Sequence, residues 1–115
     1  MKPTPIEQLI KKDLEFFLYH KSQTKLTQED AINIGAYVAA NFLRIIFSKN
    51  KELQPEEING VFGIVSNVYH DLFENQFTQS DYERLSSQAL DLLKNTEFEQ
   101  NSKIFFAEIM KTKEQ

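Results

Sequence analysis

The chain of 115 residues has no cysteine and no tryptophan, and it contains only three glycines, three prolines and two histidines. Without cysteine it forms no disulfide bond and offers no thiolate to a metal ion. An all-β domain of this length needs many more turn residues, so the shortage of glycine and proline favours helices. No apolar run approaches the ~18 residues of a membrane span, and the N-terminal sequence lacks the apolar core of a signal peptide.

What the chain does have is an ordinary globular composition: 41% hydrophobic residues, including ten phenylalanines, 26% charged residues and a net charge of −4. This balance is typical of a folded domain. The length fits one domain over residues 1–115, and no linker is long enough to divide it. The missing cysteines agree with a reducing cytoplasm. The abundance of Lys, Asn, Gln, Ile and Phe suggests a bacterial or phage source.

Five segments carry helix start signals, either a side chain that caps the first backbone amides or a proline in the first turn. These signals lie at Thr4, Thr27, Pro55, Ser80 and Thr96, with Glu83 and Glu99 completing capping boxes in the last two. The expected helices span residues 5–20, 28–48, 55–75, 81–94 and 97–112. Short polar linkers favour antiparallel neighbours. The sequence therefore predicts an all-α fold, a compact bundle of about five helices.

Two of the expected helices are largely uncharged. No charged residue occurs from Ala31 to Leu43, and none from Ile58 to His70 if histidine is counted as neutral. A helix with one exposed side usually carries charge there, whereas the other three segments are amphipathic. We therefore expect the 28–48 and 55–75 helices to form the centre of the bundle, with the other three packed around them.

The 55–75 helix carries a weakly polar back face, formed by Gly60, Gly63, Ile64 and Asn67, away from its main apolar stripe. One interpretation is that the fourth and fifth helices cover this face. The other is an exposed patch that binds a partner protein or a second copy of the chain, which would make a homodimer.

The 28–48 helix has a narrow polar stripe of Asn33, Tyr37, Asn41 and Arg44. Tyrosine and arginine are enriched at binding hot spots, because each buries a large area and still forms directional hydrogen bonds. The stripe is therefore a candidate partner-binding site. The alternative is a solvated helix edge, or a pairing of Arg44 with an acidic neighbour.

The residues that could do chemistry are few. Asp13 lies within the apolar stripe of the first helix, where a carboxylate needs a partner or the edge of a pocket. His20 and His70 lack the Glu-x-x-His spacing of bundle metal sites, and no nucleophile or phosphate-loop motif occurs. We expect no metal and no cofactor. Four linker lysines, Lys21, Lys25, Lys49 and Lys51, fall in two linkers, so we expect no nucleic-acid partner.

The sequence favours a small non-enzymatic protein-binding module that inhibits, neutralises or scaffolds a partner protein. In size and class alone the chain is similar to the small helical bundles of bacterial immunity and inhibitor proteins, and fold class does not determine function. One alternative is an apolar ligand bound between aromatic side chains. Its pocket would be lined by Phe16, Phe17, Phe42, Phe62, Phe105 and Phe106. The other is a small bundle enzyme using Asp13, His20 or His70.

Overall fold

The computed structural model describes residues 5–23, 25–50 and 54–111. Five α-helices and a short 3-10 turn make up most of these residues, which confirms the predicted all-α bundle. The elements are α1 Pro5–Ser22, α2 Gln28–Asn50, α3 Pro55–Phe73, η1 Glu74–Gln76, α4 Gln79–Lys94 and α5 Phe98–Lys111. The predicted cap at Thr4 lies outside the described residues.

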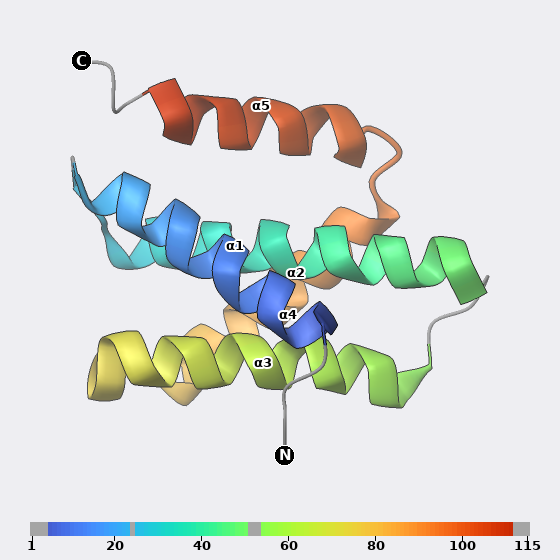
Figure 1. The fold of residues 1–115 in the computed structure, drawn as a ribbon, viewed down its shortest axis with the longest axis horizontal. Coiled ribbons are helices and arrows are strands. Elements are labelled where there is room, and N and C mark those ends of the chain that lie inside the picture. Colours follow the sequence, from blue (N-terminus) through green and yellow to red (C-terminus); the bar gives the residue numbers. More distant parts are fainter. Residues whose placement is uncertain (1–4, 24, 51–53, 112–115) are drawn as a thin grey trace.

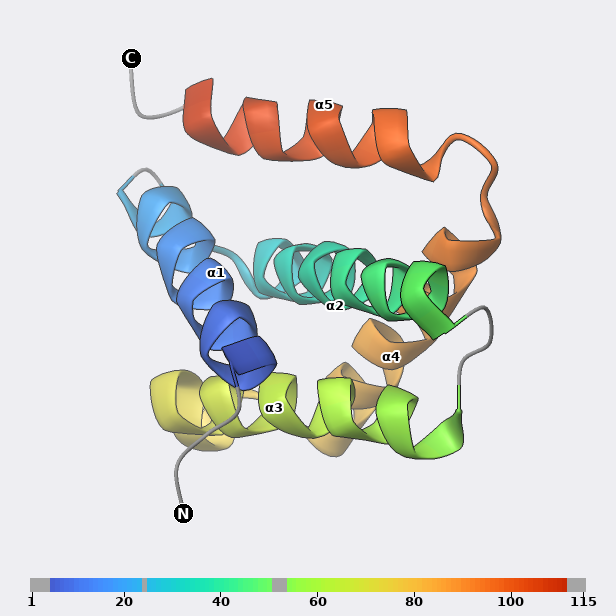
Figure 2. The ribbon, with the colours of Figure 1, turned by 45° about the vertical axis from the view of Figure 1, so that its right-hand side comes forward.

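Helix α2 runs through the middle of the bundle. Figure 1 shows α5 on one side of α2 and α3 on the other, while α1 crosses in front and α4 lies behind. The turned view in Figure 2 keeps α2 between α5 and α3 and shows α1 beside α2. Helix α2 packs against α1, α3 and α4, so the prediction that this uncharged helix forms the centre is confirmed.

The packing around α2 depends on a glycine. A Cβ atom at Gly35 would lie 2.5 Å from the Leu85 side chain and 2.7 Å from Tyr69 Oη. Tyr69 is fully buried, and its hydroxyl donates a hydrogen bond of 2.6 Å to Ala31 O. Gly35 therefore lets α3 and α4 approach the backbone of α2 more closely than any larger residue would allow.

Helix α3 lies at the edge of the bundle and not in its centre, which corrects the sequence-based prediction. Its Val61, Val65 and Tyr69 side chains are buried, whereas Gly60 and Gly63 on the opposite side are exposed. Cover of the back face by α5, part of one of the two interpretations, is wrong, since α5 lies across α2 from α3 (Figures 1 and 2). Helix α4 borders this face at Asn67 and leaves Gly60 and Gly63 exposed. The exposed side of α3 consists of glycine, asparagine and histidine and has no large apolar side chain to bury, so the absence of charge did not require burial.

The helix starts follow the predicted chemistry with a shift at α4. At α2, Asp30 N donates to Thr27 Oγ1 and Thr27 N donates to Asp30 Oδ2, as predicted. Each of these two hydrogen bonds is 3.1 Å long. The cap of helix α4 lies two residues before the predicted cap at Ser80, because Thr78 and Asp81 form the capping box and Gln79 is the first helical residue.

The start of α5 also differs from its predicted capping box. Asn95 Oδ1 accepts a hydrogen bond of 2.9 Å from Glu97 N, ahead of the first helical residue Phe98. Phe98 is fully buried, which anchors the beginning of this helix in the core. The side chain that caps the chain here is therefore Asn95, one residue before the predicted Thr96.

One stretch of α2, Gln28–Phe47, is long and apolar enough to cross a membrane by length and composition. Half of this stretch is buried inside the bundle. The core helix of a soluble protein has the same character, and the compact bundle is consistent with a soluble protein.

Candidate functional site

The outer face of α3 is the side of that helix opposite its buried valines. We define it by five exposed residues at helical spacing: Asn59, Gly60, Gly63, Asn67 and His70. A Cβ atom added at Gly60 or Gly63 would meet no heavy atom of the described chain within 4 Å. Packing within the described chain therefore does not require glycine at either position, although each glycine in a helix costs about 1 kcal/mol against alanine. Ile64, predicted to share this face, is half-buried against the core instead.

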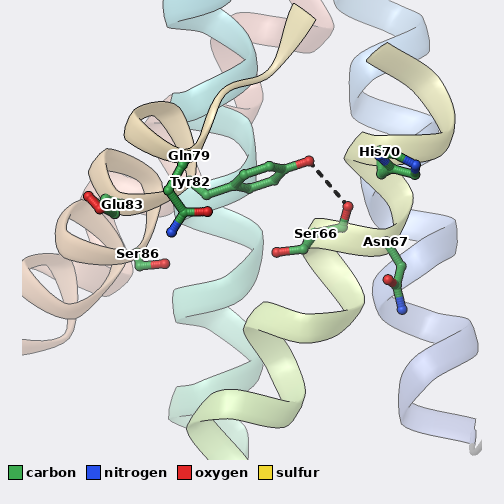
Figure 3. A pocket seen from close by; sticks show the side chains of 7 residues that line it. All are labelled: Ser66, Asn67, His70, Gln79, Tyr82, Glu83 and Ser86. Carbon is green, nitrogen blue, oxygen red and sulfur yellow. Dashed lines mark hydrogen bonds between the residues drawn. The ribbon is translucent and has the colours of Figure 1, made fainter. Parts of the chain in front are cut away.

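A polar groove adjoins this face between α3 and α4. This α3–α4 groove has a volume of about 560 Å³ and is lined by Ser66, Asn67, His70, Gln79, Tyr82, Glu83 and Ser86. Figure 3 shows the Tyr82 ring reaching from α4 towards α3, where its hydroxyl donates a hydrogen bond of 3.3 Å to Ser66 O. Asn67 and His70 belong both to the groove and to the outer face, so the two surfaces are continuous.

The groove offers hydrogen-bond donors and acceptors with little charge. Its lining contains two serine hydroxyls, two amides, an imidazole and one carboxylate, that of Glu83. Burial raises the pKa of Tyr82, and the nearby Asp81 carboxylate adds to the rise. Tyr82 therefore stays a neutral hydroxyl at physiological pH. Among the described residues, no three His, Asp or Glu side chains converge to hold a metal ion. The groove is suited to recognising polar groups.

The segment that forms this surface carries charge of one sign. From Pro55 to Glu83 the chain contains no lysine or arginine, while all 13 of its basic residues and 11 of its 17 acidic residues lie elsewhere. The acidic residues of this stretch are Glu56, Glu57, Asp71, Glu74, Asp81 and Glu83. The net charge of −4 hides this segregation, which a count of charges along the sequence would have found.

The polar stripe of α2 serves contacts within the chain. Asn33 accepts a hydrogen bond from Gln88 Nε2 of α4. Asn41 Nδ2 donates to Ser102 Oγ of α5 over 3.0 Å. The Tyr37 ring, which is half-buried, stacks on a phenylalanine of α5 with 4.2 Å between ring centroids.

Arg44 completes the stripe. Its guanidinium lies 3.2 Å from Glu99 Oε1 and above the Phe98 ring, 5.6 Å from the centroid. Arg44 therefore pairs with an acidic neighbour, as one of the two structural interpretations of the sequence predicted. The stripe joins α2 to α4 and α5, and its partner-binding role stays a prediction outside the site described above.

The three residues considered for catalysis do not share the α3–α4 groove. His70 lines it, whereas Asp13 and His20 lie on α1 and do not. Burial raises the pKa of the half-buried Asp13, and the positive charge of Lys12 partly opposes the rise. His20 is buried beside the Phe16 ring, at 4.3 Å between centroids, and its Nδ1 has no hydrogen-bond partner among the described residues.

The aromatic side chains proposed to line a ligand pocket pack largely on one another. Phe17 stacks on Phe106 with centroids 4.3 Å apart, and Phe105 stacks on Tyr37. A second groove, the α1–α3 groove, has a volume of about 410 Å³ and is lined by Glu15, Leu18, Tyr19, Ser22, Leu26, Leu72 and Phe73. None of the six candidate phenylalanines lines either groove.

No family model, curated protein or solved structure matches this chain. A five-helix bundle hosts many functions, so the fold alone assigns none. The outer face of α3 and the α3–α4 groove are therefore the surfaces that bear on function.

Proposed function

We propose that the protein is a non-enzymatic binding module that docks a partner protein on the outer face of α3 and the adjoining α3–α4 groove. The observation that carries the proposal is the pair of exposed glycines, Gly60 and Gly63, in the middle of a regular helix. Gly35 has a packing reason to be glycine, because α3 and α4 close over it. The exposed pair has no such reason within the described chain, and a partner that approaches the helix backbone closely supplies one.

The surface has the anatomy of a small protein-binding site. Its centre carries no charge, so a partner covers it without removing water from an unpaired ion. The groove beside it presents hydroxyl, amide and imidazole groups that hydrogen-bond to polar side chains of the partner. Asn67 and His70, shared by both surfaces, lie where the glycine-containing face meets the groove. Binding here would let the protein inhibit, neutralise or scaffold its partner.

The test is a quantitative comparison of the proteins captured from the native host by the wild type and by Gly63→Glu. Open space above Gly63 keeps the variant folded, while the carboxylate blocks close approach. Ala107→Glu is the matched control, since Ala107 is also an exposed small residue, on α5. A partner lost by Gly63→Glu and kept by Ala107→Glu supports the proposal. Identical captures by all three proteins contradict it.

A second candidate function is the binding of an apolar small molecule in the α1–α3 groove, where leucine, tyrosine and phenylalanine side chains line an open hollow. An apolar fluorescent dye tests it. Leu72→Asp should abolish the dye signal, because Leu72 lines the groove and is 48% exposed. Leu90→Asp is the control on α4, 36% exposed and away from the groove. Equal signals from both variants remove this candidate.

A further inference from the structure

We infer that the partner segment docked on the outer face of α3 is a basic helix, with lysine or arginine on both sides of a centre of small uncharged residues. The inference rests on the proposed function and adds the chemistry of the partner. Carboxylates border this face, and glycines lie at its middle.

Carboxylates stand at both ends of the outer face. Glu56 lies in the first turn of α3 and Asp71 in the last, and both are exposed. Fifteen residues of helix place them about 22 Å apart along the axis. Glu83, on α4, adds a third exposed carboxylate beside the groove. A partner with positive charge at matching positions meets each of them, while its uncharged middle lies over the glycines.

A second copy of this chain fits the same face poorly. If two α3 helices pack antiparallel, Glu56 of one copy approaches Asp71 of the other. If they pack parallel, each carboxylate approaches its own equivalent. No lysine or arginine between Pro55 and Glu83 offsets these contacts, and like charges across an interface are unfavourable. Charge complementarity therefore selects a basic partner over self-association.

The interior of the bundle shows how glycine is used in this fold. At Gly35, the absence of a side chain brings the α3 and α4 side chains onto the α2 backbone. Gly60 and Gly63, one turn apart on the outer face, present the same opening with no helix over it. A helix that crosses α3 at this point packs in the way that neighbouring helices pack on α2.

The experiment is a nuclear magnetic resonance titration of the full ¹⁵N-labelled chain with two synthetic alanine-rich helical peptides. Both have the same Ala-Ser-Ala-Ala centre, and one carries lysines at both ends where the other carries glutamates. The lysine peptide should shift the amide signals of Gly60, Gly63 and Asn67, and its affinity should fall several-fold between low and physiological salt. The glutamate peptide should leave these signals unchanged.

Two double variants show whether the bordering carboxylates contribute to binding of the lysine peptide. Glu56→Gln with Asp71→Asn should weaken the lysine peptide at least three-fold. The control, Asp91→Asn with Glu108→Gln, removes two exposed carboxylates from α4 and α5 and should leave the affinity unchanged. Equal weakening by both pairs would show nonspecific attraction to net charge and would overturn the inference.

The remaining outcomes separate this inference from the proposed function. If both peptides shift the α3 signals equally, the docking face stands and the basic partner is wrong. If the lysine peptide shifts only signals outside α3, or shifts no signals, the inference of a basic partner is also wrong. The comparison of proteins captured by the wild type and by Gly63→Glu then tests the proposed function independently. A dimer detected by light scattering and abolished by Gly63→Glu would make a second copy the occupant and would overturn the inference.

Discussion

At the scale of single residues, three helical glycines occupy different surroundings, and this difference yields a stability prediction. Gly63→Ala should raise the free energy of unfolding by about 1 kcal/mol and the melting temperature by about 4 °C, because alanine favours helix and has open space. Gly35→Ala should lower both, since its Cβ would lie 2.5 Å from the Leu85 side chain. Thermal unfolding followed by circular dichroism measures the two shifts, and a lower melting temperature for Gly63→Ala would contradict the description of that face.

Asp13 gives a prediction about pH. Burial raises the pKa of this carboxyl in the folded state above its ordinary value of 3.8, so folding favours the protonated form. The ionised form therefore lowers stability at neutral pH, and this loss disappears as the pH falls below about 3.8. Asp13→Asn should melt at a higher temperature than the wild type at pH 7, with the difference lost at pH 3. A difference that persists at pH 3 would assign the effect to packing.

At the scale of helices, local sequence signals located individual helices correctly but did not predict how the helices pack together. The Thr27 capping box and the apolar run of α2 are both local patterns, and both located their element correctly. The edge position of α3 was missed because glycine, serine and asparagine read as uncharged whether they are buried or hydrated. The α3–α4 groove was missed because it depends on where α4 meets α3, a contact that no local pattern specifies.

The start of α4 shows how a buried neighbour overrides a local signal. Phe77 is 7% exposed and packs its ring edge-on against Tyr69 and Tyr82. Burial of this ring fixes the chain immediately before Thr78, so Thr78 becomes the cap. Thr78→Ala should lower the free energy of unfolding by about 1 kcal/mol, and Ser80→Ala should leave it nearly unchanged. Urea unfolding distinguishes the two variants, and the reverse order would restore the sequence-based cap.

At the scale of the whole molecule, the chain separates its charges. The stretch from Pro55 to Glu83 is acidic, and the rest of the chain holds all 13 basic residues. This separation is not needed to fold α3, whose stability comes from valines buried on its inner side. Carboxylates that border an uncharged face would instead attract a basic partner and orient its approach. The proposed partner chemistry therefore follows from a property of the molecule that no single residue displays.

In the proposed function, Gly60 and Gly63 serve the binding of a partner and not the packing of the fold. The most direct measurement takes the partner identified by the Gly63→Glu comparison and determines its affinity for Gly60→Ala with Gly63→Ala, alongside the melting temperature of that variant. We predict that the double variant melts at a higher temperature than the wild type and binds the partner at least ten-fold more weakly. A variant that melts higher and binds as tightly as the wild type would show that the outer face of α3 is not the docking surface.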